Sequence, residues 1–212
     1  MKLPFQTGGN MDEFSKETEK MTHTIWHKIF YITFLILSFA AVVFVSTPSY
    51  SAMISVENDN TIYIRGDILE GDGEAFQKTL KLHPEASIVN IISIGGVVNE
   101  GLIIAEEIYN RGMTTYIPKD GVCYSMCSFI FLSGKEKIMH LGQRLGFHPP
   151  YIIEDGKNIV HTDTVAHISW WLGRVGIPLE VIWAMMAVSP DDVYKVDGID
   201  LNNVGIGIIL LN

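Results

Sequence analysis

Apolar and polar residues follow two different patterns along the chain. Residues 29–45 form an apolar run without any charged residue. From about residue 53, short apolar runs of strand length alternate with stretches in which apolar residues recur every three or four positions. Strands are expected near residues 61–66, 87–92, 113–117, 138–139, 145–147 and 204–211. Helices are expected from Asp72 to the residue before Pro84, after Asn99, and over residues 124–132, 165–176 and 179–188.

Two of the expected helices carry candidate N-caps. Asp72 is expected to cap the first, with Phe76 and Leu80 on its buried face. Asn99 is expected to cap the next. Its inward-facing residues would be Leu102, Ala105, Ile108 and Tyr109. In the helix that follows residue 164, the pair Trp170-Trp171 is expected to turn at most one indole toward the core.

Strands that alternate with helices indicate an α/β fold with a mainly parallel sheet. In such sheets, ligands bind beyond the carboxyl ends of the strands. Two strand-to-helix turns therefore matter most for function. One is residues 93–96, Ser-Ile-Gly-Gly, and the other is residues 121–127, Gly-Val-Cys-Tyr-Ser-Met-Cys.

The apolar run at residues 29–45 predicts export. His27 and Lys28 precede it, and small residues at alternate positions follow it up to Ala52. This order is typical of a secretory signal peptide cut near Ser51 or Ala52, although the run is also long enough for an uncleaved membrane anchor. Three parts are expected: a polar segment (1–28), a signal peptide or anchor (29–52) and one domain (53–212). The protein would be periplasmic, or membrane-anchored and facing outside the cytoplasm.

Charge and composition exclude some classes of function. Residues 1–51 hold four basic and four acidic residues, so the whole net charge of −9 falls on the rest of the chain. A surface of that sign repels nucleic acid. His140, His161 and His167 have no metal-ligand spacing with carboxylates or cysteines. Neither a metal nor a cofactor is expected.

The two turns and one histidine could together perform acyl transfer. Such chemistry needs an activated hydroxyl, an imidazole that takes its proton, and backbone N–H groups aimed at the oxyanion. Ser125 lies at a strand-to-helix junction, and the Gly95-Gly96 turn lets a backbone approach closely. His148 precedes Pro149-Pro150, which keeps the chain extended. Periodicity alone does not bring these residues together.

The order of these motifs resembles the proteolytic subunit of the Clp protease. Ser93 to Gly96, then Ser125-Met126, Gly134 and residues 146–150 (Gly-Phe-His-Pro-Pro) follow one another at comparable spacing. The resemblance covers residues 60–150 well and residues 160–212 loosely. It implies the ClpP/crotonase-like superhelix of ββα units. It also makes Ser125 the nucleophile, His148 the base and the N–H groups of Gly95 and Met126 the oxyanion hole.

The third member of the implied triad is either Asp191 or Asp192. We choose Asp192. The alternative is that Ser-Pro-Asp-Asp, residues 189–192, merely caps a following helix. Ser128 and Ser133 are expected to pack or to bond back to their own helix. Ile94 replaces the usual proline of the family, and no loop for docking an ATPase is evident.

Cys123 and Cys127 flank Ser125, and the chain has no other cysteine. Two cysteines alone are weak support for zinc, and in an exported protein a disulfide is favoured over free thiols. The chain is similar in this respect to a group of exported bacterial proteins with a Cys-x-Ser-x-Cys signature.

Three classes of function follow. The leading one is a serine peptidase or other acyl hydrolase that acts on a peptide or protein substrate through an acyl-enzyme. The main alternative is a non-catalytic assembly or binding module that keeps the fold. The third class is acyl-CoA chemistry. The apolar leader argues against this class. The protein could form homo-oligomers and could contact a membrane through residues 29–45.

Overall fold

The computed structural model describes residues 51–58 and 60–212. The predicted polar segment 1–28 and the apolar run 29–45 lie outside the described residues. Among those that are described, no helix is both long enough and apolar enough to cross a bilayer.

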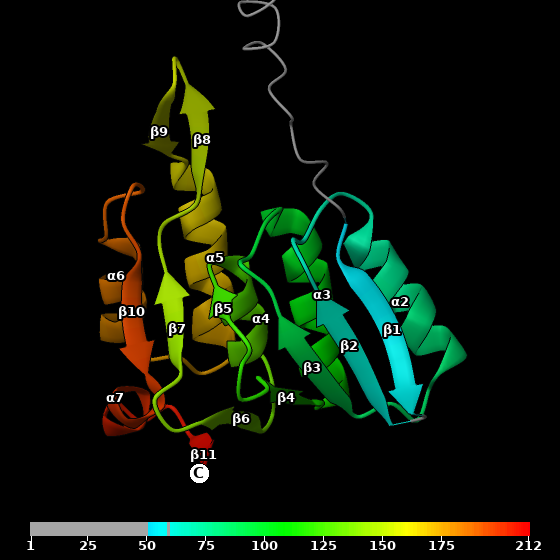
Figure 1. Ribbon diagram of the computed structural model, residues 1–212. Coiled ribbons are helices and arrows are strands. Elements are labelled where there is room, and N and C mark those ends of the chain that lie inside the picture. The colour runs from blue at the N-terminus through cyan, green and yellow to red at the C-terminus, as the bar shows by residue number, and fades with distance from the viewer. Residues whose placement is uncertain (1–50, 59) are drawn as a thin grey trace, which may run out of the picture. The chain divides into compact units, whose positions relative to one another are not determined.

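The largest element of the fold is a six-stranded sheet (Figure 1). Its strands, in spatial order, are β1 (Met53–Asn58), β2 (Thr61–Arg65), β3 (Ile88–Ile92), β4 (Thr114–Tyr116), β6 (Lys137–His140) and β11 (Ile208–Leu211). Only the edge strand β1 runs antiparallel to its neighbour, and the other four pairings are parallel. The predicted α/β class with a mainly parallel sheet is therefore confirmed.

Two smaller sheets complete the strands. One consists of β10 (Tyr194–Asp197), β7 (Arg144–Phe147) and β5 (Cys123–Tyr124), in that order. The other is a hairpin of β8 (Tyr151–Glu154) and β9 (Lys157–Val160), which stands away from the rest of the domain in Figure 1. The hairpin follows His148 directly in the chain, so it begins at the candidate site.

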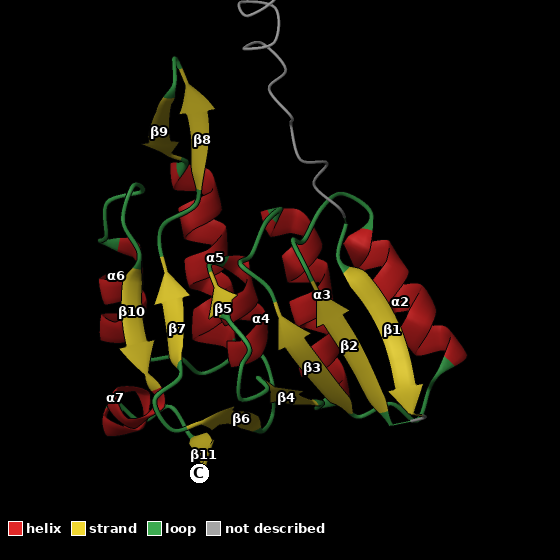
Figure 2. Cartoon of the chain, viewed as in Figure 1, coloured by secondary structure: helices red, strands yellow, loops and turns green. Residues whose placement is uncertain are grey.

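Six helices are described: α2 (Asp72–Leu82), α3 (Val98–Arg111), α4 (Met126–Leu132), α5 (Thr162–Arg174), α6 (Leu179–Met186) and α7 (Gly198–Asn203). In the view of Figure 2, α3, α4 and α5 lie behind the strands. The most deeply buried helix is α4, in which every residue is inaccessible to solvent. Trp171 is 3% exposed and Trp170 59%, so one indole of the pair faces the core, as predicted.

The two-residue strand β5 was not expected from the sequence, nor were four longer strands: β1, β8, β9 and β10. Their burial explains why. β1 is an edge strand without a fully buried residue, and all four residues of β8 are exposed. β10 buries only Val196. A strand that buries no regular face leaves no regular apolar pattern in the sequence.

Several predicted element ends are wrong. Gly71 occupies the N-cap of α2, and Asp72 is its first residue. Val97 is the N-cap of α3, and Tyr109 is 39% exposed instead of facing inward. The last strand covers only Ile208–Leu211, because Val204 is the C-cap of α7 and residues 205–207 form the connection that follows this helix. Residues 189–192 lead into β10, so they cap no helix.

Asp72 serves the fold in another way. Its side chain is 2% exposed and accepts hydrogen bonds from Leu69 N (2.7 Å), Ala52 N (3.1 Å) and Ser51 Oγ. One buried carboxylate thus ties residues 51–52 to the loop that follows β2. The packing of the domain therefore includes Ser51 and Ala52.

Candidate active site

The two turns singled out in the sequence lie side by side. Ser93 forms a parallel bridge with Cys123. Ser93 N donates to Val122 O (3.0 Å), and Tyr124 N donates to Ser93 O (3.2 Å). These bonds extend β3 onto the start of β5, so the Gly95-Gly96 turn and Ser125 emerge from adjacent strand ends. This contact between residues about 30 positions apart is what the sequence pattern could not supply.

Ser125 has an unusual backbone conformation. It is the N-cap of α4 with φ 54° and ψ −128°, a region that residues with a side chain rarely adopt. Its N–H donates to Gly146 O (2.7 Å), which fixes the serine against β7. Strained backbone persists only where its surroundings enforce it, and such residues cluster at functional sites.

The side chain of Ser128 stabilises the turn that carries Ser125. Its buried hydroxyl lies 2.9 Å from both Cys123 O and Gly146 O, and so connects α4 to β5 and β7. The expectation that Ser128 packs is therefore confirmed, whereas the alternative expectation, a bond back to its own helix, is not met. It holds for Ser133, whose Oγ donates to Phe129 O (3.0 Å). No sequence pattern indicates this role of Ser128, because its two acceptors are backbone atoms.

Cys123 and Cys127 form a disulfide, as expected. Their Cα atoms are 5.2 Å apart, and both side chains are buried. The bond joins β5 to the first turn of α4, on either side of Ser125. It therefore braces the segment that carries the candidate nucleophile.

Gly95 lies directly against Ser125. Its φ is +100°, and a Cβ at this position would lie 2.6 Å from Ser125 Cβ and 2.8 Å from Met126 N. No other residue type fits this space. Ile68 holds the turn from the opposite side, since Ile68 N donates to Gly95 O and Val97 N donates to Ile68 O, both at 2.8 Å.

The N–H groups of the two predicted oxyanion donors differ in whether they already have a hydrogen-bond acceptor. Met126 is the first residue of α4, a position whose N–H has no acceptor one turn earlier in the helix. Gly95 N–H donates to Ser93 Oγ (3.0 Å). Gly95 could therefore stabilise an oxyanion only if this N–H is shared with Ser93 or turns away from it.

His148 follows β7 and has its ring oriented by its own neighbours. Nδ1 lies 2.9 Å from Pro149 O, and the ring centroid is 5.5 Å from that of Tyr151. A carbonyl oxygen can only accept, so Nδ1 carries the proton in this bond. In the neutral imidazole the lone pair is then on Nε2, the atom that a general base needs.

Ser125, His148, Gly95 and Met126 all line one cavity of about 320 Å³. Its volume is within the range of small-ligand sites. Most of the remaining wall is apolar and comes from Leu69, Ile94, Val98, Phe129, Pro150 and Ile168. Four residues predicted from separate motifs are thus brought to one concave, largely apolar site.

The aspartates at 191 and 192 do not line this cavity. Both are exposed, and Asp191 Oδ1 accepts a hydrogen bond from Asn158 Nδ2 (3.0 Å). In the antiparallel register Tyr194 lies opposite Phe147, so residues 192–193 approach the strand end that carries His148. Within the described part of the chain, His148 makes no hydrogen bond to a carboxylate. Asp192 as a triad member stays a prediction.

Among residues 51–58 and 60–212, no three histidine, cysteine, aspartate or glutamate side chains are grouped so that they could bind a metal ion.

Comparison with known proteins finds similarity in structure and not in sequence. No protein-family model matches the sequence, and no curated protein sequence matches it. A mutant of the 1510-N membrane-bound stomatin-specific protease shares the fold with a TM-score of 0.56 at 14% identity, over 74% of this chain and 81% of that one. A second mutant of this protease, in complex with a substrate peptide, gives 0.56 at 15% identity, over 74% and 77%.

The catalytic domain of the ClpP protease from Plasmodium falciparum gives a TM-score of 0.51 at 19% identity, over 72% of this chain and 85% of that chain. These likenesses do not extend to the crotonase branch or to the Cys-x-Ser-x-Cys group, which remain predictions. The described domain has the mixed α/β fold of the ClpP-like serine proteases.

Proposed function

We propose that this chain is an exported serine peptidase or related acyl hydrolase. The observation that supports this most directly is the convergence of Ser125 and His148 on one cavity, with Ser125 held in a strained turn. Ser125 Oγ attacks the substrate carbonyl while His148 Nε2 takes the hydroxyl proton. The N–H groups of Met126 and Gly95 stabilise the oxyanion.

The tetrahedral intermediate then breaks down to an acyl-enzyme. The bond to the leaving amine breaks, His148 returns the proton to that amine, and the acyl group stays on Ser125. Water deprotonated by His148 then hydrolyses the ester. Asp192 is proposed as the residue that stabilises the imidazolium, which requires its exposed side chain to turn toward His148.

A fluorophosphonate probe tests the mechanism. Purified protein should be modified at Ser125, and Ser125→Ala should abolish the modification. His148→Ala should slow it strongly, because the base activates the hydroxyl. The matched control is His167→Ala, which removes an exposed imidazole from α5 and should label at the wild-type rate. Equal labelling of wild type and Ser125→Ala would exclude the mechanism.

Two observations favour the alternative, a binding or assembly module without catalysis. Gly95 N–H is engaged by Ser93 Oγ, and Asp192 is exposed without a bond to His148. If this alternative is correct, Ser125 remains unlabelled even though the protein is folded. Circular dichroism on the same sample distinguishes that outcome from misfolding.

We also propose export directed by residues 29–45. The buried disulfide is compatible with an oxidising compartment. Since Asp72 binds both Ser51 Oγ and Ala52 N, a leader that is removed should be cut before Ser51. A reporter fused after residue 60 should be active only if it works outside the cytoplasm. Intact-mass analysis of the exported protein gives the cut position.

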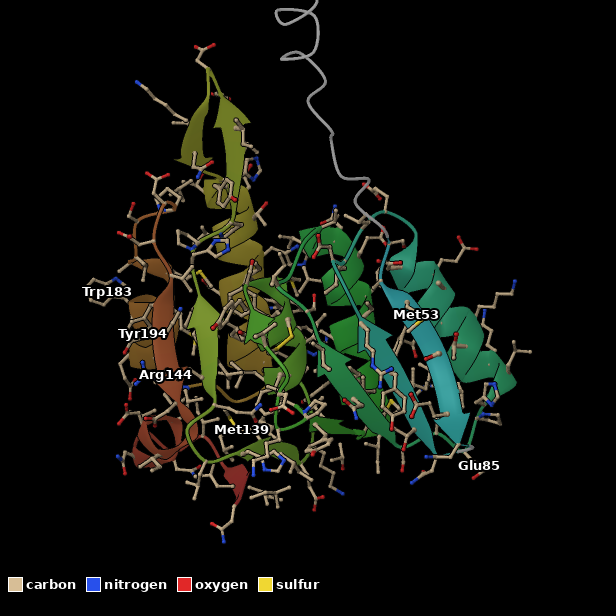
Figure 3. All side chains as sticks on the ribbon, viewed as in Figure 1. Met53, Glu85, Met139, Arg144, Trp183 and Tyr194 are labelled. Carbon is tan, nitrogen blue, oxygen red and sulfur yellow. A yellow bond between two sulfur atoms is a disulfide. The ribbon has the colours of Figure 1, made fainter. Side chains whose placement is uncertain are left out.

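Self-association is the remaining part of the proposal. Large apolar side chains lie exposed on the hairpin and on α6, including Ile153 (71%) and Trp183 (73%), and Trp183 projects away from the domain in Figure 3. Exposed apolar groups of this kind mark interaction surfaces. Sedimentation should detect a homo-oligomer, and Ile153→Asp should weaken it. A wild-type protein that sediments as a monomer would exclude this part.

A further inference from the structure

The wall of the cavity beside Ser125 contains a carboxylate that the proposed mechanism does not use. Asp67 follows β2 and lines the same cavity as Ser125 and His148. Neither lysine nor arginine contributes to that wall, among the residues the structure describes. Most of the wall around Asp67 is apolar, so its charge is less screened than that of a carboxylate on an open surface.

The backbone holds Asp67 firmly beside the Gly95 turn. Gly66 N donates to Ile92 O (3.0 Å), and Ile68 N donates to Gly95 O (2.8 Å). The residues on either side of Asp67 are therefore bonded to the end of β3 and to the turn that follows it. This arrangement fixes the backbone of Asp67 relative to the Gly95 turn of the candidate site.

No side chain in the described part of the chain neutralises Asp67. Its carboxylate makes neither a hydrogen bond nor an ion pair there. The nearest arginine in sequence, Arg65, pairs with Glu57 (3.2 Å) and lies over the ring of Tyr63 (4.6 Å). Asp72 differs in that it is buried and accepts three hydrogen bonds. Asp72 therefore has an evident structural role, and Asp67 does not.

We propose that Asp67 determines specificity: it selects substrates that carry a lysine or arginine side chain next to the scissile bond. The apolar wall would contact the aliphatic stem of such a side chain, and Asp67 would bind its cationic end. The strongly acidic chain would also attract basic substrates to the site. This inference rests on the proposed function, because it names the substrate class of that same site.

The test uses two peptidyl diphenyl phosphonates that differ only in the side chain beside phosphorus. One carries lysine and the other norleucine, its uncharged analogue. On the full-length protein, the rate constant for modification of Ser125 should be about tenfold larger with the lysine probe, and the ratio should fall as salt is added. Asp67→Asn should reduce the ratio to about two or less, and Asp67→Lys should favour a glutamate probe over the lysine probe.

Glu70→Gln is the matched control. It removes the same charge from the same loop, at an exposed residue that does not line the cavity, so the ratio should stay at the wild-type value. Modification of Ser125 at equal rates by both probes would overturn the role of Asp67 and leave the proposed hydrolase intact. If Asp67→Asn reduced the rates with the lysine probe and the norleucine probe by the same factor, that result would also overturn the role of Asp67. Absence of modification by every probe would overturn the proposed function and this inference together.

Discussion

Replacement of Gly95 by alanine tests the geometry of the site most directly. The new Cβ would lie 2.6 Å from Ser125 Cβ, 2.8 Å from Met126 N and 2.9 Å from Tyr124 O, on a backbone with φ +100°. Strain at such a φ costs about 1–3 kcal/mol, and a forced contact in a packed region costs about 1–3 kcal/mol more. Since two of the three crowded groups are backbone atoms, the turn itself must move.

Gly95→Ala should therefore be destabilised by about 2–6 kcal/mol, which lowers the Tm of a domain of this size by roughly 10 °C. Displacement of Ser125 or Met126 N by a few tenths of an ångström to 1 Å should also lower the rate of fluorophosphonate labelling by about 100-fold. Labelling should be measured at 20 °C, where the variant remains folded by circular dichroism, so that the two effects are separated.

Gly142→Ala is the matched control. Gly142 also has a positive φ (+83°), but a Cβ there would meet nothing within 4 Å. It should carry the backbone strain alone, about 1–3 kcal/mol or a Tm loss of roughly 2–12 °C, and should label normally. The reasoning is refuted if Gly95→Ala labels as fast as wild type, or if the two variants lose the same stability and activity.

Three further changes have outcomes that the structure predicts. Replacement of Cys123 and Cys127 by alanine should lower the free energy of unfolding by less than the ~3 kcal/mol expected for a 15-residue loop, but should slow fluorophosphonate labelling clearly. Oxidised wild type should be about two mass units lighter than the reduced protein. Two alkylatable thiols would contradict the disulfide. Asp72→Asn should destabilise the fold by about 1–3 kcal/mol in chemical denaturation, because the amide has one acceptor oxygen for three donors. An unchanged midpoint would contradict the role of Asp72. Burial lowers the pKa of Lys137, so the unfolded chain binds this proton more tightly. Lys137→Met should raise the Tm at pH 7 by a degree or two, and its advantage should shrink as pH rises toward about 10; an advantage that grows with pH would refute this.

Two strands of the parallel sheet, β2 and β3, could be predicted because each buries three of its five residues. Their apolar residues distinguish these segments from the turns around them. β10 and the hairpin lack such a pattern, since they bury one residue or none. The sequence did not predict these strands, because their few buried side chains leave no regular apolar spacing.

The candidate site was predicted in part from residue type and in part from resemblance. Ser125, Gly95 and His148 are conspicuous in the sequence, because a serine in a turn, a glycine pair and a histidine before prolines suit acyl transfer. Ser128 and Asp67 were not singled out. A buried serine that donates to distant carbonyls, and an aspartate after a strand, resemble many residues that have no such role.

The sequence by itself determined the strands and helices that have a regular apolar spacing, most of the turns between them, and which side chains are chemically able to react. These properties depend on neighbours in the chain, whose spacing is printed in the sequence. Only the tertiary structure decided that Ser93 bonds to the strand of Cys123, that Gly146 fixes Ser125, and that Asp67 faces the same cavity as His148. Those contacts join residues about 20 to 80 positions apart, and they form where strands distant in the sequence pair edge to edge. No local pattern carries that information.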